Sequence, residues 1–207
     1  PNAKRFQSDM AVVVAKSATE HAMALRSKNP MSKLSGGMRL FVAGLREMNP
    51  DKAYAPDANS TLRLTYGVID DYKAADAVQY DYYTTTDGIM EKRDNTNPEF
   101  VVPDKLAELI RKKDFGRYAD KDGKLVTCFI HNLDITGGNS GSPVIDGRGN
   151  LIGIAFDGNW EAMSGDIAFE PALQRTISVD IRYVLFTIEK LMDGKNIIDE
   201  LKFASKK

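Results

Sequence analysis

Gly137-Gly138-Asn139-Ser140-Gly141-Ser142-Pro143-Val144 is the stretch from which this sequence is best interpreted. Glycines before a serine allow backbone N–H groups to turn toward one point, where they can stabilise a carbonyl oxygen that develops negative charge. The small residues on both sides of Ser140 leave its hydroxyl accessible to a substrate. The pattern therefore predicts a nucleophilic serine at position 140 and an oxyanion-binding loop built from its neighbours.

The base that such a serine needs is missing from the sequence. A hydroxyl is a poor nucleophile unless a base removes its proton. The stretch resembles the nucleophile loop of chymotrypsin-like serine peptidases, in which a histidine and an aspartate precede the serine. His21 and His131 precede Ser140, but one stands in a helix-like segment and the other ends a strand-like segment, so we interpret both as structural. We expect this chain to hold the nucleophile of a site whose base lies elsewhere.

Composition narrows the classes of partner. The 207 residues are 43% hydrophobic and carry a formal net charge of −1, which gives no electrostatic reason to expect nucleic acid or an anionic membrane. No apolar run approaches the roughly 20 residues of a membrane span, and no signal peptide is visible. The chain starts at Pro1, so we expect a processed product or a segment of a longer protein. Cys128 is the one cysteine and lies in an apolar run, which favours a buried structural thiol.

The residue pattern changes near position 56. Apolar residues recur at helical spacing over 8–26 and 38–48, and Asn29-Pro30 and Asn49-Pro50 end these segments. Alternating, β-branched and aromatic residues follow. Strands are predicted over residues 62–67, 78–84, 125–131, 144–145, 151–156 and 175–179, and helices over 103–113 and 181–192. We therefore expect a helical segment over 1–55 and, over 56–207, a mainly β domain of antiparallel strands closed by a C-terminal helix.

Four separated motifs carry a more specific resemblance. They are Pro56-Asp57-Ala58-Asn59-Ser60-Thr61-Leu62-Arg63, Asn132 to Pro143, Phe156-Asp157-Gly158-Asn159-Trp160-Glu161, and Arg175 to Tyr183. In this order they resemble the S46 family of bacterial dipeptidyl-peptidases, which includes types 7 and 11. The resemblance extends from about Phe6 to the C-terminus.

The resemblance implies an architecture larger than this chain. Members of the family have a double-barrel peptidase domain interrupted by a helical domain, and their catalytic histidine and aspartate precede that insertion. Residues 1–55 would then be the end of the helical domain, and residues 56–207 the second barrel. The family also implies a homodimer in the periplasm or at the cell surface of a Gram-negative bacterium. Its substrates are peptides with free N-termini, and it uses no metal or other cofactor.

Functional residues carry over from the family motifs one by one. Ser140 matches the nucleophile, and the backbone N–H groups of Gly138 and Ser140 match the oxyanion hole. The segment from Ile154 through Phe156 to Gly158 matches the strand along which substrate pairs. Within it, Asp157 matches a residue close to the bound amine, where a carboxylate attracts an ammonium group.

Gly158 is the residue that bears on specificity. Type 11 enzymes, which prefer Asp or Glu as the second residue, carry Arg at the matching place. Gly158 leaves an uncharged pocket, so the resemblance implies type 7, with aliphatic or aromatic second residues. Asp134 stands where trypsin-like enzymes bind a basic side chain, but the same aspartate looks like a general family feature, so we expect a structural or supporting role.

Two other functions remain open from the residues alone. The nucleophile loop also occurs in glutamyl-type endopeptidases of the chymotrypsin-like fold. A non-catalytic barrel that serves as an interaction module could retain the loop as well. Asp120-Lys121-Asp122-Gly123 resembles the start of a calcium loop, but the remaining ligands are absent and the pattern predicts a turn.

Overall fold

The computed structural model describes residues 6–28, 31–51, 60–165 and 169–204. It divides into two compact units, Pro1–Ala55 and Pro56–Lys207, each of which is described by itself. The first half of the Pro56–Arg63 motif lies outside the described residues. No helix of the described residues is both long enough and apolar enough to cross a membrane.

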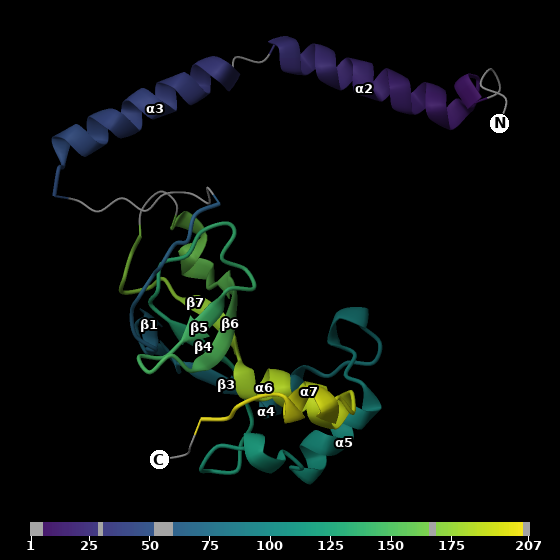
Figure 1. The fold of residues 1–207 in the computed structure, drawn as a ribbon, viewed down its shortest axis with the longest axis vertical. Helices are drawn as coiled ribbons and strands as arrows, with labels where there is room; N and C mark the ends of the chain where they lie inside the picture. Colours follow the sequence, from purple (N-terminus) through teal and green to yellow (C-terminus); the bar gives the residue numbers. More distant parts are fainter. Residues whose placement is uncertain (1–5, 29–30, 52–59, 166–168, 205–207) are drawn as a thin grey trace. The chain divides into compact units, whose positions relative to one another are not determined.

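The described part of the first unit includes the helices α2 (Met10–Lys28) and α3 (Met31–Met48) (Figure 1). The carboxylate of Asp9 caps the start of α2 by accepting the Ala11 N–H at 2.9 Å. Helix α2 confirms the prediction over 8–26. Helix α3 begins earlier than the predicted Met38, because it runs through Gly36 and Gly37 in spite of their low helix propensity.

The second unit is built on a five-stranded antiparallel sheet in the order β3-β4-β7-β6-β5. Its strands are β3 (Tyr83–Thr85), β4 (Val126–His131), β5 (Pro143–Ile145), β6 (Leu151–Gly158) and β7 (Thr176–Asp180). A separate hairpin joins β1 (Tyr72–Ala75) to β2 (Val78–Tyr80). The predictions of β4, β7 and the β5–β6 hairpin are confirmed, and the sheet has the expected antiparallel pairing. Its closure into a barrel stays a prediction.

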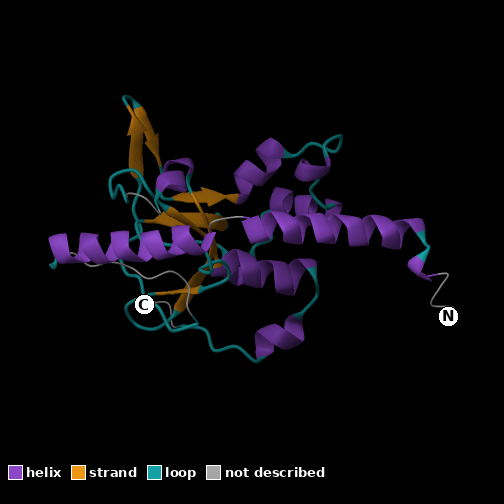
Figure 2. Cartoon of the chain, turned by 90° about the horizontal axis from the view of Figure 1, so that it is seen from above, coloured by secondary structure: helices purple, strands orange, loops and turns teal. Residues whose placement is uncertain are grey.

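Helical segments gather at one end of this sheet (Figures 1 and 2). They are α4 (Thr86–Lys92), α5 (Asp104–Lys112), α6 (Ile181–Phe186), a π-helical turn (Thr187–Leu191), α7 (Lys195–Asp199), and short 3₁₀ turns at Pro98–Phe100 and Gly116–Tyr118. The predicted helix over 181–192 is therefore an α-helix continued by a π turn. Asp180 caps it by accepting the Arg182 N–H at 2.8 Å.

The main hydrophobic core lies among these helical segments and the chain that enters β4. Phe186 is fully buried, and its ring meets Phe115 and Tyr118 edge-on at 5.9 and 6.4 Å between ring centroids. Leu106 and Ile110 of α5 are also buried in this core. The predicted helix over 103–113 is thus confirmed together with its apolar face, and Pro103 stands immediately before its first turn.

Two strand predictions are wrong. Residues 62–67 form no strand, because the chain first joins the sheet at Val68, whose carbonyl accepts the Asn132 N–H at 3.0 Å. The alternating Leu62 and Leu64 are 99% and 86% exposed. The predicted strand over 78–84 is two strands, because β2 pairs with β1 whereas β3 pairs with β4. A change of sheet between Tyr80 and Tyr83 is what interrupts the ladder.

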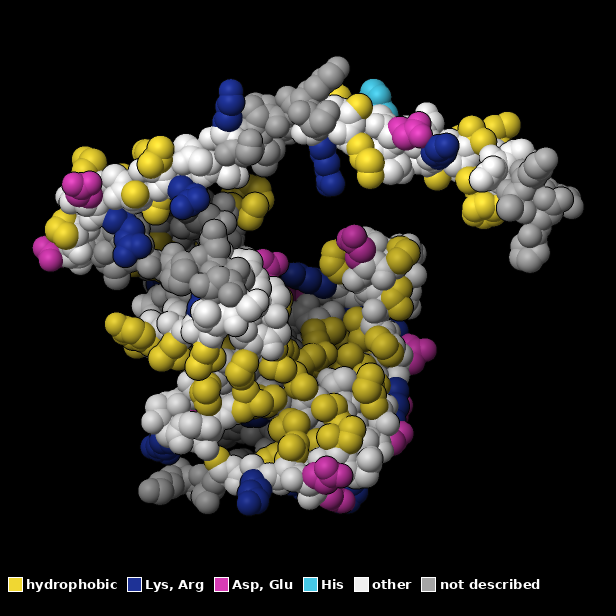
Figure 3. Space-filling model, turned by 45° about the horizontal axis from the view of Figure 1, so that its top comes forward, with side chains coloured by type: hydrophobic (Ala, Val, Ile, Leu, Met, Phe, Trp, Pro, Cys, Tyr) yellow, Lys and Arg dark blue, Asp and Glu magenta, His cyan; other side chains and the backbone are white. Residues whose placement is uncertain are grey.

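Hydrophobic side chains gather on the face of the second unit that Figure 3 shows. In the second unit, the exposed hydrophobic residues include Leu62, Leu64, Tyr66, Trp160 and Met163. Isolated exposed apolar residues are ordinary, but a cluster of them indicates a surface that another segment or protein covers.

Candidate active site

Ser140 lies in a turn between β4 and β5 that is tied to β6. The Gly141 N–H donates to the Ala155 carbonyl at 2.7 Å, and the Ala155 N–H donates to the Ser142 carbonyl at 3.0 Å. Gly138 and Gly141 have φ values of 98° and 84°, which residues with a Cβ rarely adopt. The glycines of the motif are therefore required by the backbone of the turn.

The turn leaves Ser140 exposed and its neighbouring amides available. The Ser140 hydroxyl donates to the Phe156 carbonyl at 3.3 Å, a long hydrogen bond. Among the described residues, the N–H groups of Gly138 and Ser140 donate to no protein acceptor, whereas the Asn139 N–H donates to Thr136. The two free amides are those expected to form the oxyanion hole.

The end of β6 lies beside Ser140 and has one uncovered edge. Strand β5 pairs with β6 only as far as Ile154, which faces Pro143 on one side and Val179 on the other. Beyond Ala155, β6 keeps its pairing with β7, and a bulge falls at Phe156. Toward Ser140, the Phe156 carbonyl accepts the serine hydroxyl and the Gly158 N–H donates to the Asp157 carboxylate at 2.8 Å. The side chains of Ser140 and Asp157 thus occupy the backbone carbonyl and N–H with which a substrate strand would pair.

A cavity of about 260 Å³ brings most of the predicted site residues together. Its lining includes Ser140, Phe156, Asp157, Gly158, Ala162 and Met163. Ile154 is not part of the lining, and its backbone is paired with β5 on one side and β7 on the other. Asp157 is the one charged residue among the described residues of the lining. Ala162 and Met163, which we call the wall of the cavity, belong to a 3₁₀ turn over Trp160–Ser164.

His131, the histidine of the second unit, does not line this cavity. His21 is exposed on α2 of the first unit. His131 is 1% exposed, and its Nε2 lies 2.8 Å from the Ser178 hydroxyl in the adjacent strand. Burial lowers the pKa of His131 to about 4, so its ring is neutral near pH 7. These surroundings support the interpretation of His131 as a structural residue.

Comparison with known proteins shows the family to which this chain belongs. Residues 1–203 match the family described as Peptidase S46. The chain belongs to the peptidase S46 family. The match to the S46 family covers nearly the whole chain and therefore includes both of its structural units.

Relatives of this S46 chain are dipeptidyl-peptidases. It is 58% identical over 177 residues to dipeptidyl-peptidase 7 of Phocaeicola vulgatus, covering 84% of this chain and 24% of the relative. It is 52% identical over 202 residues to dipeptidyl-peptidase 7 of Porphyromonas gingivalis, covering 97% and 28%. An Asp/Glu-specific dipeptidyl-peptidase of Porphyromonas gingivalis is 50% identical over 163 residues, covering 79% and 23%. The chain spans about a quarter of the length of these relatives.

A solved S46 structure has the same fold. The crystal structure of Porphyromonas endodontalis DPP11 in complex with the dipeptide Arg-Glu matches with a TM-score of 0.86 at 42% identity, covering 97% of this chain and 29% of that chain. A second crystal structure of that protein, in complex with Arg-Asp, matches with a TM-score of 0.84.

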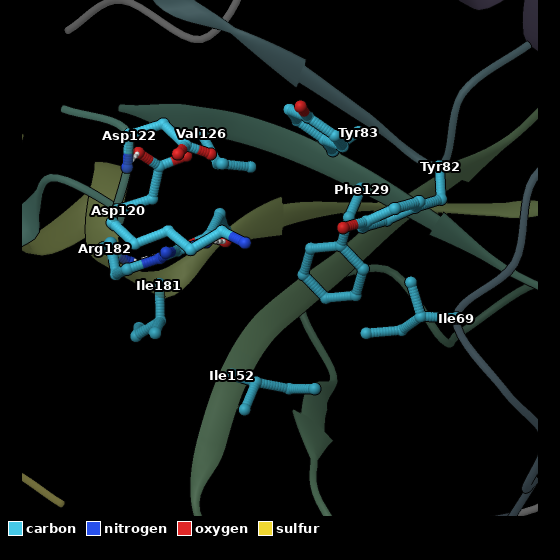
Figure 4. Close-up of a pocket in the computed structure, with 12 residues that line it drawn as sticks. Ile69, Tyr82, Tyr83, Asp120, Asp122, Val126, Phe129, Ile152, Ile181 and Arg182 are labelled. Carbon is cyan, nitrogen blue, oxygen red and sulfur yellow. Dashed lines mark hydrogen bonds and ion pairs between the residues drawn. The ribbon is translucent and has the colours of Figure 1, made fainter. Parts of the chain in front are cut away.

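Other features of this S46 chain lie apart from Ser140. A larger cavity, of about 440 Å³, has an apolar side formed by Ile69, Tyr82 and Phe129 and a charged side that includes Asp120 and Arg182 (Figure 4). Ser140 is not part of its lining. The loop at Asp120 is a turn, because the Asp120 carboxylate accepts the N–H groups of its own segment rather than facing a set of ligands. Within the described ranges, no group of three or more His, Cys, Asp or Glu side chains could hold a metal ion.

Asp134 is exposed and lies outside the cavity of Ser140. It borders a separate hollow of about 20 Å³ next to Arg175. The sequence did not indicate the wall at Ala162 and Met163 or the residues that hold it. The run Asn159-Trp160-Glu161 belongs to one of the family motifs, which marks this segment as a candidate part of the site. Nothing in the sequence indicates which residues its side chains contact.

Proposed function

We propose that this S46 chain carries the nucleophile of a serine dipeptidyl-peptidase that releases dipeptides from the free N-termini of peptides. One observation carries the proposal: Ser140 shares a cavity with the end of β6, and the two amides beside it have no acceptor among the described residues. A nucleophile, donors for an oxyanion and a strand edge for substrate are the parts that acyl transfer from a peptide requires.

The chemistry divides between this chain and the rest of a longer protein. The Ser140 oxygen attacks the carbonyl carbon that follows the second residue, and a histidine outside this chain takes the hydroxyl proton. The carbonyl oxygen becomes an oxyanion held by the N–H groups of Gly138 and Ser140. The histidine then protonates the departing amine as the peptide bond breaks. Water hydrolyses the resulting acyl-enzyme, releasing the dipeptide and restoring the serine.

Substrate pairs with the edge of β6 from Phe156 to Gly158. To do so it displaces the Ser140 hydroxyl from the Phe156 carbonyl and the Asp157 carboxylate from the Gly158 N–H. The released Asp157 carboxylate then pairs with the substrate ammonium, a charge-assisted hydrogen bond that a blocked N-terminus cannot make. Ile154 of the predicted substrate strand supports this edge from within the sheet.

The cavity favours an apolar second residue. Phe156, Ala162 and Met163 offer apolar surface, and Gly158 introduces neither bulk nor charge. The relatives named dipeptidyl-peptidase 7 at 52–58% identity support the assignment to type 7. A type 11 enzyme would place an arginine at position 158.

The remaining parts of the proposal concern the longer protein. Residues 1–55 are the end of its helical domain, and residues 56–207 form the second barrel of a chymotrypsin-like double-barrel peptidase. The complete protein is a homodimer in the periplasm or at the cell surface. The exposed Leu62, Leu64 and Tyr66 support the presence of further protein against the second unit.

The test uses the full-length protein and a panel of dipeptidyl fluorogenic substrates. The substrates carry Leu, Met, Asp or Lys in the second position, each with a free and with an acetylated N-terminus. We expect turnover to be highest for free substrates with Leu or Met, and to fall at least a hundredfold in the Ser140→Ala variant, since removal of a catalytic nucleophile is far costlier than loss of one binding contact. The Ser142→Ala variant is the matched control and retains activity.

Two results would contradict the proposal. Equal cleavage of acetylated substrates would indicate an endopeptidase of the glutamyl or another type. Unchanged turnover in Ser140→Ala would show that the serine loop has no catalytic function and that the second unit serves as an interaction module.

A further inference from the structure

The wall formed by Ala162 and Met163 is held in place by side-chain hydrogen bonds of Asn159, the residue just before its 3₁₀ turn. Asn159 precedes the 3₁₀ turn of Trp160–Ser164, and its side chain joins the segment that enters β7. Its Nδ2 donates to the Leu173 carbonyl at 2.8 Å, and its Oδ1 accepts the Arg175 N–H at 2.9 Å. The beginning of the wall is therefore fixed to the sheet, while Ala162 and Met163 project beyond it into the cavity lining.

A second attachment comes from the β1–β2 hairpin. The Tyr72 hydroxyl donates to Oε2 of Glu161, inside the 3₁₀ turn, at 3.1 Å. Tyr72 is 9% exposed and its ring stacks on Tyr80 with 5.2 Å between centroids. Burial raises the pKa of Tyr72, the Asn159 side chain lowers it and Glu161 raises it, and because the net direction is upward the phenol keeps its proton and remains a donor at neutral pH.

Arg175 keeps Tyr72 in this position. Its guanidinium lies 5.5 Å from the centre of the Tyr72 ring and donates to the Asp71 carbonyl at 2.7 Å. The Arg175 side chain is 4% exposed and lies 3.6 Å from the Asp70 carboxylate. The guanidinium of Arg175 therefore joins the base of the hairpin to the segment that enters β7, while its backbone N–H is held by Asn159 at the end of β6.

We infer that Tyr72 is a positioning residue, which sets the place of the Ala162–Met163 wall through Glu161 and so tunes the preference for the second residue of the substrate. This inference rests on the proposed function. Tyr72 itself is not part of the cavity lining, so it acts through the wall and not by touching the substrate.

The packing around Gly158 explains why a small shift of the wall matters. A Cβ placed at Gly158 would lie 3.0 Å from Cβ of Ala162, closer than ordinary van der Waals contact. Gly158 and Ala162 are thus packed against each other with no room for a side chain between them. A displacement of the turn therefore changes the cavity lining at the point where these two residues meet.

The experiment compares variants of the full-length protein on substrates with Leu or Ala in the second position. Tyr72→Phe removes the hydroxyl and keeps the ring, whereas Tyr80→Phe makes the same change on the stacked tyrosine as a matched control. Glu161→Ala removes the acceptor, and Glu161→Gln retains a carbonyl oxygen that can accept from Tyr72. Thermal unfolding of each variant measures the purely structural effect.

We expect Tyr72→Phe to lower the Leu-to-Ala ratio of kcat/KM roughly threefold to tenfold, which corresponds to the net worth of one hydrogen bond. The change appears in KM, with kcat within about twofold, because the wall binds the side chain in ground and transition states alike. Glu161→Ala matches this loss, Glu161→Gln largely restores the ratio, and the double variant of Tyr72→Phe with Glu161→Ala loses no more than either single one.

Several results would overturn the inference. They are an unchanged ratio in Tyr72→Phe, an equal loss in Tyr80→Phe, and a uniform loss on both substrates that follows a lower unfolding temperature. Ser140→Ala distinguishes these outcomes from failure of the proposed function. Loss of turnover in Ser140→Ala with an unchanged ratio in Tyr72→Phe removes only the positioning role, whereas full turnover in Ser140→Ala overturns both.

Discussion

His131 is a buried imidazole that is hydrogen-bonded to a hydroxyl group. Its Nε2 lies 2.8 Å from the Ser178 hydroxyl, and its Nδ1 has no hydrogen-bond partner among the described residues. Burial lowers the pKa of His131 to about 4, below its ordinary value of 6.5. The folded state therefore favours the neutral ring, while the unfolded state takes up a proton as soon as the pH falls below about 6.5.

The resulting prediction concerns stability against pH. The unfolded chain binds more protons between these two pKa values, so the contribution of His131 is complete above pH 6.5 and is lost as the pH falls toward 4. Between pH 7 and pH 5 we expect the free energy of unfolding to drop by about 2 kcal/mol from this group. Urea unfolding at both pH values measures it.

The His131→Gln variant should reduce that pH dependence, because an amide does not titrate. The exposed His21 provides the matched control, and His21→Gln should leave the dependence as it is. A pH dependence of His131→Gln equal to that of the unsubstituted chain would contradict the assignment of the effect to this imidazole.

At the scale of the element, β6 depends on the close approach of an aromatic ring. A Cβ placed at Gly153 would lie 2.6 Å from Cε1 of Phe129 and 2.8 Å from the Val179 carbonyl oxygen. Phe129 is buried in β4, and the carbonyl belongs to the backbone of β7, so neither can move away freely. The glycine lets the ring cover the strand directly.

We expect Gly153→Ala to lower the free energy of unfolding by about 1–3 kcal/mol, the usual cost of overpacking a core. Gly147→Ala in the β5–β6 turn is the control, because a Cβ there meets nothing within 4 Å and the change should stay within about 0.5 kcal/mol. Chemical denaturation of both variants decides the matter, and equal stabilities would show that Phe129 relaxes without cost.

The elements that the sequence predicted well are those whose partners lie within the described part of the chain. The β5–β6 hairpin and α5 have apolar patterns that match the contacts they make. The strand predicted over 62–67 has an equally regular alternation, but it has no neighbouring strand there, and its apolar face is exposed. Hydrophobic periodicity indicates which side chains share a face, but it does not indicate what covers that face.

The same limit applies to the candidate site. The backbone of the turn at Ser140 requires glycines, so the local sequence was sufficient to locate it. The hydrogen bond between Tyr72 and Glu161 joins residues 89 positions apart in the sequence. Neither residue belongs to a sequence pattern that is typical of such a contact. Ile154 shows the converse, because it belongs to the strand that the sequence indicated but does not line the cavity.

On the scale of the whole molecule, the nucleophile turn is formed, but the described lining of its cavity holds no histidine that could serve as its base. Ser140 is exposed, and its hydroxyl donates a hydrogen bond to the Phe156 carbonyl. A carbonyl oxygen is too weak a base to remove the hydroxyl proton. The described histidines are the buried His131 and the exposed His21, and neither lines the cavity. Because a serine reacts with a fluorophosphonate only when a base activates it, labelling of Ser140 reports on the completeness of the site.

We expect the full-length protein to be labelled at Ser140 and this chain alone to react at least a hundredfold more slowly, as the contribution of a general base is typically 10²–10⁴-fold. Rates of labelling followed by intact-mass spectrometry give the comparison, and Ser140→Ala in the full-length protein identifies the labelled residue. Adding the remaining N-terminal part as a separate polypeptide should restore labelling if the two parts associate. Rapid labelling of this chain by itself would mean that a base within it reaches Ser140, and His131→Gln would then be the variant to compare first.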